Sequence, residues 1–144
     1  MVRIDLRHKN IFLDTAPLIY FIEGNSLYQD KLNQVFSSND KGDFVFITSS
    51  ITLLEVLVKP LKEGQTKLVE KYINILTNAR GIEIFDITKA LAIKAAELRA
   101  KYNLRTPDSK QLATAIEYHA DYFLTNDIRL KSVVEINSIV LSEL

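Results

Sequence analysis

Four acidic residues stand where an apolar run ends or a helix is expected: Asp14, Glu55, Asp108 and Asp127. They come from four separate segments of the chain. If their side chains met, the negative charges would repel one another strongly unless a cation neutralised them. The types and the spacing of these residues therefore indicate a cation-binding site.

Each acid taken alone also has a purely structural explanation. Asp14 could cap the helix that follows it, and Asp108 could complement a helix dipole. Glu55 could pair with Lys59 one turn later or form a capping box with Thr52. Asp127, in the segment Thr-Asn-Asp, could be an ordinary turn acid. The joint pattern favours a common site, and the structural explanations remain open for each residue.

The surrounding elements alternate between short apolar runs and longer helical patterns. Strands are expected at 11–13, 44–47, 82–87, 122–124 and 139–141. Helices are expected at 15–23, 28–36, 51–59, 68–76, 91–102 and 106–120. In the third helix Pro60 is expected to end the helix, and Ser49 or Ser50 to cap its start. In the last helix Thr106 is the expected N-cap, with Lys110 and Gln111 facing solvent.

Strands separated by helices imply right-handed crossovers and a parallel sheet that is covered on both faces. We predict an α/β fold: a single three-layer domain over 1–144, with a central parallel sheet of four to five strands flanked by helices. Such sheets bind ligands beyond the carboxyl ends of their strands. Asp14 and Asp127 follow strands, and Asp108 opens a helix that runs back from that same edge, so the acids are expected to meet there.

Composition narrows the function classes. The 144 residues are 47% hydrophobic and 25% charged, as expected for one globular domain, and no segment has the length of a membrane span or the pattern of a secretory signal. Cysteine is absent, which excludes thiol catalysis and fits a cytoplasmic location. The net charge is zero, so a nucleic-acid partner would need a local basic patch.

The chain resembles the PIN domain family, and most of all its small VapC-type ribonuclease toxins of toxin–antitoxin pairs. The resemblance covers 11–141 and rests on FLDTAPLIY, SSITLLEVL and TPDSKQLATAIEYHADYFLTND. It implies a PIN-like fold and cleavage of RNA phosphodiester bonds that depends on Mg²⁺ or Mn²⁺. The cytoplasmic partners that it implies are an RNA substrate, an antitoxin protein and a second copy of the chain in a homodimer.

The resemblance also assigns residue roles. Asp14 and Asp108 would hold the principal metal ion, with Glu55 and Asp127 completing its shell. Thr125 would be the active-site hydroxyl, and Asn126 part of the same turn. The chain departs from the family directly after the third acid, where Ser109-Lys110-Gln111 replaces small or apolar residues, which bears on substrate choice.

Basic and apolar residues supply the remaining candidates. Arg105, Lys110 and Arg129, with Arg99, Lys101 and Lys131 nearby, could bind flanking RNA phosphates, although solvated helix faces explain them equally well. Contact with an antitoxin or a second copy could involve apolar residues of the early helices, among them Leu18, Tyr20, Tyr28 and Leu61. Core packing is the preferred explanation for these residues.

Three other functions fit parts of the pattern. A phosphoacceptor signalling domain also has a parallel sheet and an acidic Mg²⁺ pocket, but it needs paired acids after the first strand, where Asp14 stands alone. A haloacid-dehalogenase-type phosphatase needs a second acid two positions on, where this chain has Ala16. A PIN-like module that binds RNA or protein without catalysis remains, and the presence of all four acids weighs against it.

Overall fold

The computed structural model describes residues 3–144, and a five-stranded sheet lies at their centre. The strands are β1 (Asn10–Leu13), β2 (Val45–Ser49), β3 (Ile82–Phe85), β4 (Tyr122–Thr125) and β5 (Ser138–Val140). They lie in the order β3-β2-β1-β4-β5, and every neighbouring pair is parallel. The predicted α/β fold with a parallel sheet is confirmed.

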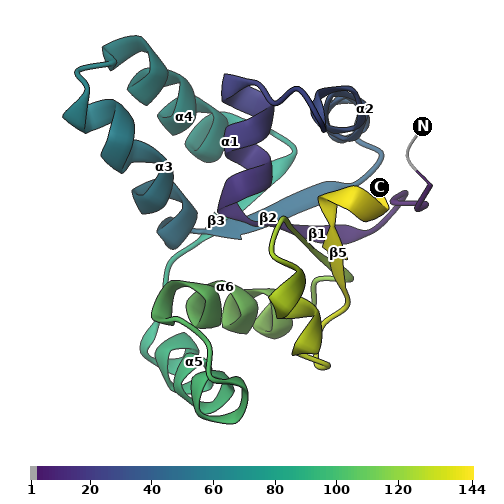
Figure 1. The fold of residues 1–144 in the computed structure, drawn as a ribbon, viewed down its shortest axis with the longest axis vertical. Coiled ribbons are helices and arrows are strands. Elements are labelled where there is room, and N and C mark those ends of the chain that lie inside the picture. The colour runs from purple at the N-terminus through teal and green to yellow at the C-terminus, as the bar shows by residue number, and fades with distance from the viewer. Residues whose placement is uncertain (1–2) are drawn as a thin grey trace.

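The helices form two layers, one on each face of the sheet (Figure 1). The first layer holds α1 (Thr15–Glu23), α2 (Gln29–Asp40), α3 (Ser50–Lys62) and α4 (Thr66–Asn78). The second holds α5 (Lys89–Tyr102) and α6 (Thr106–Glu117), followed by the short 3₁₀ helix η1 (Ile128–Ser132). A last 3₁₀ turn, η2 (Leu141–Glu143), follows β5.

Alternate side chains of each strand enter different cores. Ile11 and Leu13 pack with α1 to α4, whereas Phe12 between them packs with α5 and α6. Phe123 stacks on Phe12 in the second core, with ring centroids 5.0 Å apart. A strand that is buried on both faces must be apolar throughout, which explains the unbroken apolar runs of the sequence.

Two of the helix-boundary predictions that rest on a named residue are wrong. Pro60 does not end α3, which continues to Lys62. Pro60 lies two residues before the end of the helix, so its missing N–H removes only one helical hydrogen bond. Its ring is buried. Arg105 rather than Thr106 is the N-cap of α6, so Thr106 is already helical, and Asp108 remains in the first turn.

The prediction that Gln111 faces solvent is also wrong. Gln111 is 1% exposed, because α6 is packed between α5 and the sheet and is buried around most of its circumference. Ser49 caps α3 as expected by accepting a hydrogen bond from the Ile51 amide. None of the helices within residues 3–144 combines the length and the apolar character that crossing a membrane requires.

Candidate active site

The side chains of the four acids line one cavity of about 260 Å³ at the carboxyl edge of the sheet. Asp14 follows β1, Glu55 lies on α3, Asp108 opens α6 and Asp127 follows β4. The other residues lining the cavity are Thr15, Ala16, Ile19, Arg105, Thr125 and Asn126. The structure thus brings the predicted acids together, while their role as metal ligands stays a prediction.

Asp14 caps α1, as its structural explanation predicts, and it lines the cavity at the same time. Its Oδ1 accepts a hydrogen bond of 2.9 Å from the Thr15 amide, and its Oδ2 accepts one of 2.7 Å from the Thr125 hydroxyl. Burial raises the pKa of the Asp14 carboxyl to about 6. The two hydrogen bonds oppose this rise, and the negative charges of Asp108 and Glu55 add to it.

Thr125 and Asn126 form the turn that closes the cavity beside β4. The Thr125 side chain is fully buried, and its hydroxyl also accepts a hydrogen bond of 3.1 Å from the Asp127 amide. The Asn126 amide group donates to the Tyr20 hydroxyl at 3.1 Å, which ties the turn to α1. Both predicted residues lie at the site, Thr125 in contact with an acid and Asn126 in its wall.

Glu55 is held from across the cavity. Its Oε1 accepts a hydrogen bond of 2.7 Å from the Thr15 hydroxyl of α1. The capping box with Thr52 is wrong, since Ser49 is the N-cap of α3 and Thr52 lies inside the helix. Glu55 therefore lies in the middle of α3, and the hydrogen bond from Thr15 orients its side chain at the cavity.

Asp108 and Asp127 are each paired with an arginine. Arg105 donates from Nε to Oδ2 of Asp108 at 3.0 Å, and Arg129 donates from Nη2 to Oδ2 of Asp127 at 2.7 Å. The hydrogen bond from Arg129 lowers the pKa of the Asp127 carboxyl below its usual range. Negative charge on this side of the cavity is already compensated, in contrast to the Asp14 side.

The donor set fits a hard divalent cation. The cavity offers carboxylate and hydroxyl oxygens, the ligands that Mg²⁺ and Mn²⁺ take, and the pKa of Asp14 is raised by burial first and by the charges of Asp108 and Glu55 second. Among residues 3–144, however, no three Asp, Glu, His or Cys side chains are already arranged to hold an ion. Asp108 and Asp127 would have to turn away from their arginines to join a common shell.

A buried polar network under the cavity was missed by sequence reasoning. The Gln111 amide donates to the Thr52 hydroxyl at 2.6 Å, and Thr52 hydrogen-bonds Thr48 at 2.9 Å. Thr48 also donates to the carbonyl oxygen of Leu13, the residue before Asp14, at 2.9 Å. The network joins α6, α3 and β1, the three elements that carry Asp108, Glu55 and Asp14. The small residues 113–115 indicate a tightly packed α6 and were the available signal.

The predicted basic patch is divided by the structure. Arg105 lines the acid cavity, and Arg129 lies beside it. Lys110 lies instead with Arg99 in a groove of about 490 Å³ between α5 and α6. Residues two apart on a helix point in nearly opposite directions, so Lys110 cannot share the cavity that Asp108 faces.

The two remaining lysines of the predicted patch have acidic partners of their own. Lys101 pairs with Glu135 at 3.5 Å, and Lys131 with Glu143 at 2.6 Å. Both pairs lie in the exposed part of the surface. Arg105 and Arg129 are therefore the basic residues of the predicted patch that lie beside the acids.

Comparisons with known proteins agree with this fold. The family model described as PIN domain matches residues 11–136. The chain resembles VapBC2 from Rickettsia felis, solved with a fragment of promoter DNA, at 20% identity and a TM-score of 0.73, covering 91% of this chain and 98% of that one. A toxin–antitoxin complex from Klebsiella pneumoniae matches at 21% identity and a TM-score of 0.69, covering 93% and 99%.

A third solved structure is VapC20 from Mycobacterium tuberculosis, a toxin that cleaves the sarcin-ricin loop. It matches at 15% identity and a TM-score of 0.72, covering 88% of this chain and 98% of that one. Identities this low establish a shared fold. No curated protein matches the chain by sequence.

Proposed function

The chain belongs to the PIN domain family, and from this premise we propose that it is a metal-dependent endoribonuclease that hydrolyses RNA phosphodiester bonds. The observation that carries the proposal is the convergence of Asp14, Glu55, Asp108 and Asp127 on one cavity. The toxin VapC20, which shares the fold, cleaves an RNA loop and supports the substrate class. An RNA substrate also implies that the protein acts in the cytoplasm.

Asp14 and Asp108 would hold the principal Mg²⁺ or Mn²⁺ ion, with Glu55 and Asp127 completing its shell directly or through water. The chemistry that such a cation supplies is Lewis acidity, which lowers the pKa of water and stabilises charge on a phosphate. Thr125 and Thr15 fix the directions of the Asp14 and Glu55 carboxylates by donating hydrogen bonds to them. These two hydroxyls keep the oxygen ligands in place before RNA arrives.

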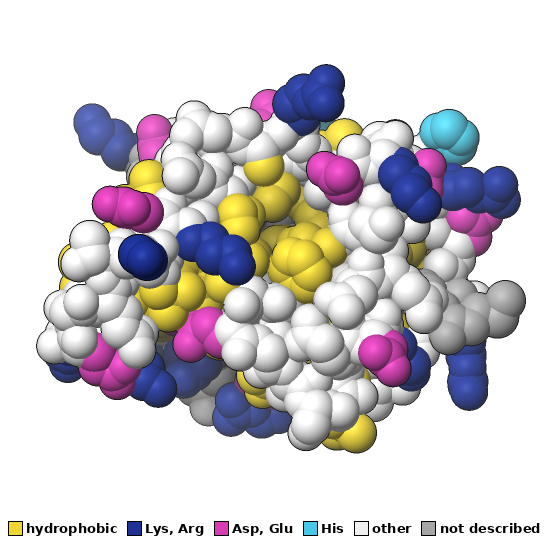
Figure 2. Space-filling model, turned by 90° about the horizontal axis from the view of Figure 1, so that it is seen from above, with side chains coloured by type: hydrophobic (Ala, Val, Ile, Leu, Met, Phe, Trp, Pro, Cys, Tyr) yellow, Lys and Arg dark blue, Asp and Glu magenta, His cyan; other side chains and the backbone are white. Residues whose placement is uncertain are grey.

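We further propose that the protein is the toxin of a toxin–antitoxin pair. The Rickettsia felis and Klebsiella pneumoniae relatives are complexes of this type. A groove of about 700 Å³ lies between the end of α1 and the start of α4, with Ile22 and Leu68 in its lining. Figure 2 looks onto the end of the molecule where α1, α2 and α4 lie, and it shows hydrophobic side chains gathered in a central depression. An apolar segment of an antitoxin would fit this surface.

We propose that a homodimer forms through a different surface. Leu54, Val58 and Leu61 follow one another at helical spacing on α3 and are 61%, 45% and 62% exposed. An apolar stripe of this kind is typical of a protein contact. Of the other candidate contact residues, Leu18 is fully buried and belongs to the core, as the preferred core-packing explanation predicts, while Tyr20 and Tyr28 are half-buried.

One observation favours a PIN-like module without catalysis as the second candidate. The pairing of Asp108 and Asp127 with arginines neutralises half of the acids without any metal. A phosphoacceptor domain has no such support. It needs a phosphorylatable aspartate after its third strand, where this chain has Asp86, and β3 is the outermost strand, separated by β2 from the cavity at β1 and β4. Binding of Mn²⁺ in the cavity separates the nuclease from the inert module.

The proposal is tested with a panel of labelled RNAs and purified protein in Mg²⁺, Mn²⁺ or EDTA. Asp108→Asn, prepared identically, is the test variant, and Asp5→Asn, which changes an exposed acid at the opposite edge of the sheet, is the control. We expect cleavage that needs metal, survives in Asp5→Asn and is lost in folded Asp108→Asn. Equal cleavage by the Asp108 variant and the unaltered protein would refute the assignment.

A further inference from the structure

A second cavity adjoins the acid cavity and shares Arg105, Asp108 and Asp127 with it. It measures about 210 Å³, and Arg129 is in its wall. Leu104 and Tyr102 give it an apolar side. It therefore combines two guanidinium groups with apolar surface directly beside the predicted metal ligands.

The arginines are held only weakly in their present positions. The side chain of Arg105 is 70% exposed and that of Arg129 is 75% exposed, whereas Asp108 and Asp127 are 14% and 25% exposed. Ion pairs with an exposed member contribute little stability, so a stronger partner can displace them. In each pair the arginine is therefore the more exposed member and the acid the more buried one.

The two ion pairs compete with a metal for the same oxygens. A carboxylate that coordinates a divalent cation gives up most of its attraction for a guanidinium, because the local charge becomes positive. The two guanidiniums also lie close enough to repel. The pKa of Arg105 is raised chiefly by the hydrogen bond to Asp108, and the charge of Arg129 opposes this rise. A cation in the first cavity would leave both arginines in need of a new anion.

A phosphodiester is the anion that suits two adjacent guanidiniums. Arginine binds phosphate oxygens through paired N–H groups, as it binds carboxylates. We propose that the second cavity is the subsite for the RNA nucleotide next to the scissile phosphate, and that Arg105 and Arg129 transfer from Asp108 and Asp127 to its phosphate when a divalent cation enters the first cavity. This inference rests on the proposed nuclease function and names the groups that bind its substrate.

The exchange couples the two ligands. Metal binding frees the arginines for RNA, and RNA binding withdraws the arginines from the carboxylates that the metal needs. Each ligand therefore raises the affinity for the other by the same factor, as thermodynamic linkage requires. Removing an arginine should then change the two affinities in opposite directions. The protein should bind the metal more tightly, because a competitor is lost, and it should bind RNA more weakly.

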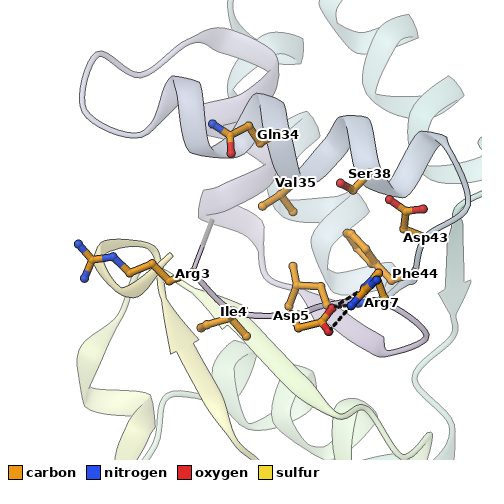
Figure 3. A pocket seen from close by; sticks show the side chains of 10 residues that line it. Arg3, Ile4, Asp5, Arg7, Gln34, Val35, Ser38, Asp43 and Phe44 are labelled. Carbon is orange, nitrogen blue, oxygen red and sulfur yellow. Dashed lines mark hydrogen bonds and ion pairs between the residues drawn. The ribbon is translucent and has the colours of Figure 1, made fainter. Parts of the chain in front are cut away.

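The chain contains a matched control for this test. Arg7 pairs with Asp5 through the same atoms and at the same spacing as Arg129 and Asp127, with Nε to Oδ1 at 3.1 Å and Nη2 to Oδ2 at 3.0 Å (Figure 3). Arg7 is 72% exposed, and it precedes β1, at the edge of the sheet opposite the acids. Arg7→Gln therefore removes an equivalent ion pair far from both cavities.

The experiment measures Mn²⁺ affinity by calorimetry without RNA, and the affinity for a labelled single-stranded RNA by anisotropy with Mn²⁺ or with EDTA. RNA integrity is checked on a gel after each titration. For Arg105→Gln and Arg129→Gln we expect Mn²⁺ affinity to rise about threefold and RNA affinity in Mn²⁺ to fall at least fivefold. Arg7→Gln should change neither, and unaltered protein should bind RNA more tightly in Mn²⁺ than in EDTA.

The possible failures are distinguishable. The exchange is overturned if the arginine variants lose affinity for both Mn²⁺ and RNA, or if they behave like Arg7→Gln. The proposed nuclease function survives either result as long as the unaltered protein binds Mn²⁺ and cleaves RNA. Unaltered protein that binds neither Mn²⁺ nor RNA overturns the proposed function and the exchange together.

Discussion

The hydroxyl of Thr125 donates a hydrogen bond of 2.7 Å to Oδ2 of Asp14, across 111 positions of sequence. The sheet register explains this contact. Leu13 pairs with Leu124 in neighbouring parallel strands, so the residues that follow them lie side by side at the carboxyl edge. Asp14, whose pKa is raised by burial, is thus oriented by the fully buried side chain of Thr125 from the neighbouring strand.

Thr125→Val should move the acid limb of the pH–rate profile to higher pH. The hydrogen bond from Thr125 lowers the pKa of Asp14, so its loss should raise that pKa further, and metal would then compete with a proton up to higher pH. The variant should also lose about 1–3 kcal/mol of stability, because the Asp14 carboxylate and the Asp127 amide lose a partner. Thr125→Ser should restore the profile. An unmoved acid limb in Thr125→Val would contradict this role.

Asp14→Asn should stabilise the protein in EDTA at neutral pH. The folded-state pKa of about 6 lies above the unfolded value of 3.8, so the folded state binds more protons between these values and loses stability as the pH rises through them. Asparagine keeps the N-cap and has no charge to bury. Urea unfolding at pH 7.5 should show a gain of about 1–3 kcal/mol over the unaltered protein, and the gain should shrink towards pH 4.

Mg²⁺ should reverse that order. The unaltered protein should gain stability from the ion by mass action, whereas Asp14→Asn has lost a ligand and should gain little. A variant that is less stable than the unaltered protein in EDTA at both pH values would show that the buried Asp14 charge does not destabilise the fold, and equal stabilisation of both proteins by Mg²⁺ would contradict the role of Asp14 as a ligand.

The apolar stripe on α3 should mediate self-association. A lysine at an exposed apolar position in an interface introduces a charge that must be desolvated, so Leu54→Lys should convert a dimer to a monomer in light scattering. Ile93→Lys is the matched control, since Ile93 is 63% exposed but lies on α5, in the other helix layer. A monomeric unaltered protein, or a dimer that survives Leu54→Lys, would remove this stripe from the proposed interface.

The strands, the helix order and the meeting of the acids followed from the sequence because hydrophobic periodicity and parallel topology determine them. The partners of Asp108 and Asp127 did not, because the directions of Arg105 and Arg129 depend on side-chain geometry that spacing leaves open. Lys110 and Gln111 were misplaced for two different reasons. Helical spacing turns Lys110 away from Asp108 into the groove between α5 and α6. Gln111, a polar residue expected in water, lies on a helix that is buried on nearly every side.

Gln111→Leu should weaken metal binding as well as lower the free energy of unfolding. The Gln111 amide joins α6 to Thr52 on α3, and thereby sets the spacing between the helices that carry Asp108 and Glu55. Loss of such a supporting contact lowers metal affinity by about 10–100-fold in other sites. A leucine of similar size fills the space and Thr52 keeps its hydrogen bond to Thr48, but the buried Ser49 hydroxyl loses Gln111 as its acceptor, so the free energy of unfolding should fall by about 1–3 kcal/mol.

Thr114→Val provides the comparison on the same helix. Thr114 is also fully buried, but its hydroxyl donates to the Lys110 carbonyl of its own helix and bridges no second element. Its replacement should change stability by a similar amount and leave Mn²⁺ affinity unaltered in calorimetry. Equal losses of Mn²⁺ affinity in the two variants would mean that Gln111 acts through general packing, and a loss confined to Gln111→Leu would establish it as a positioning residue.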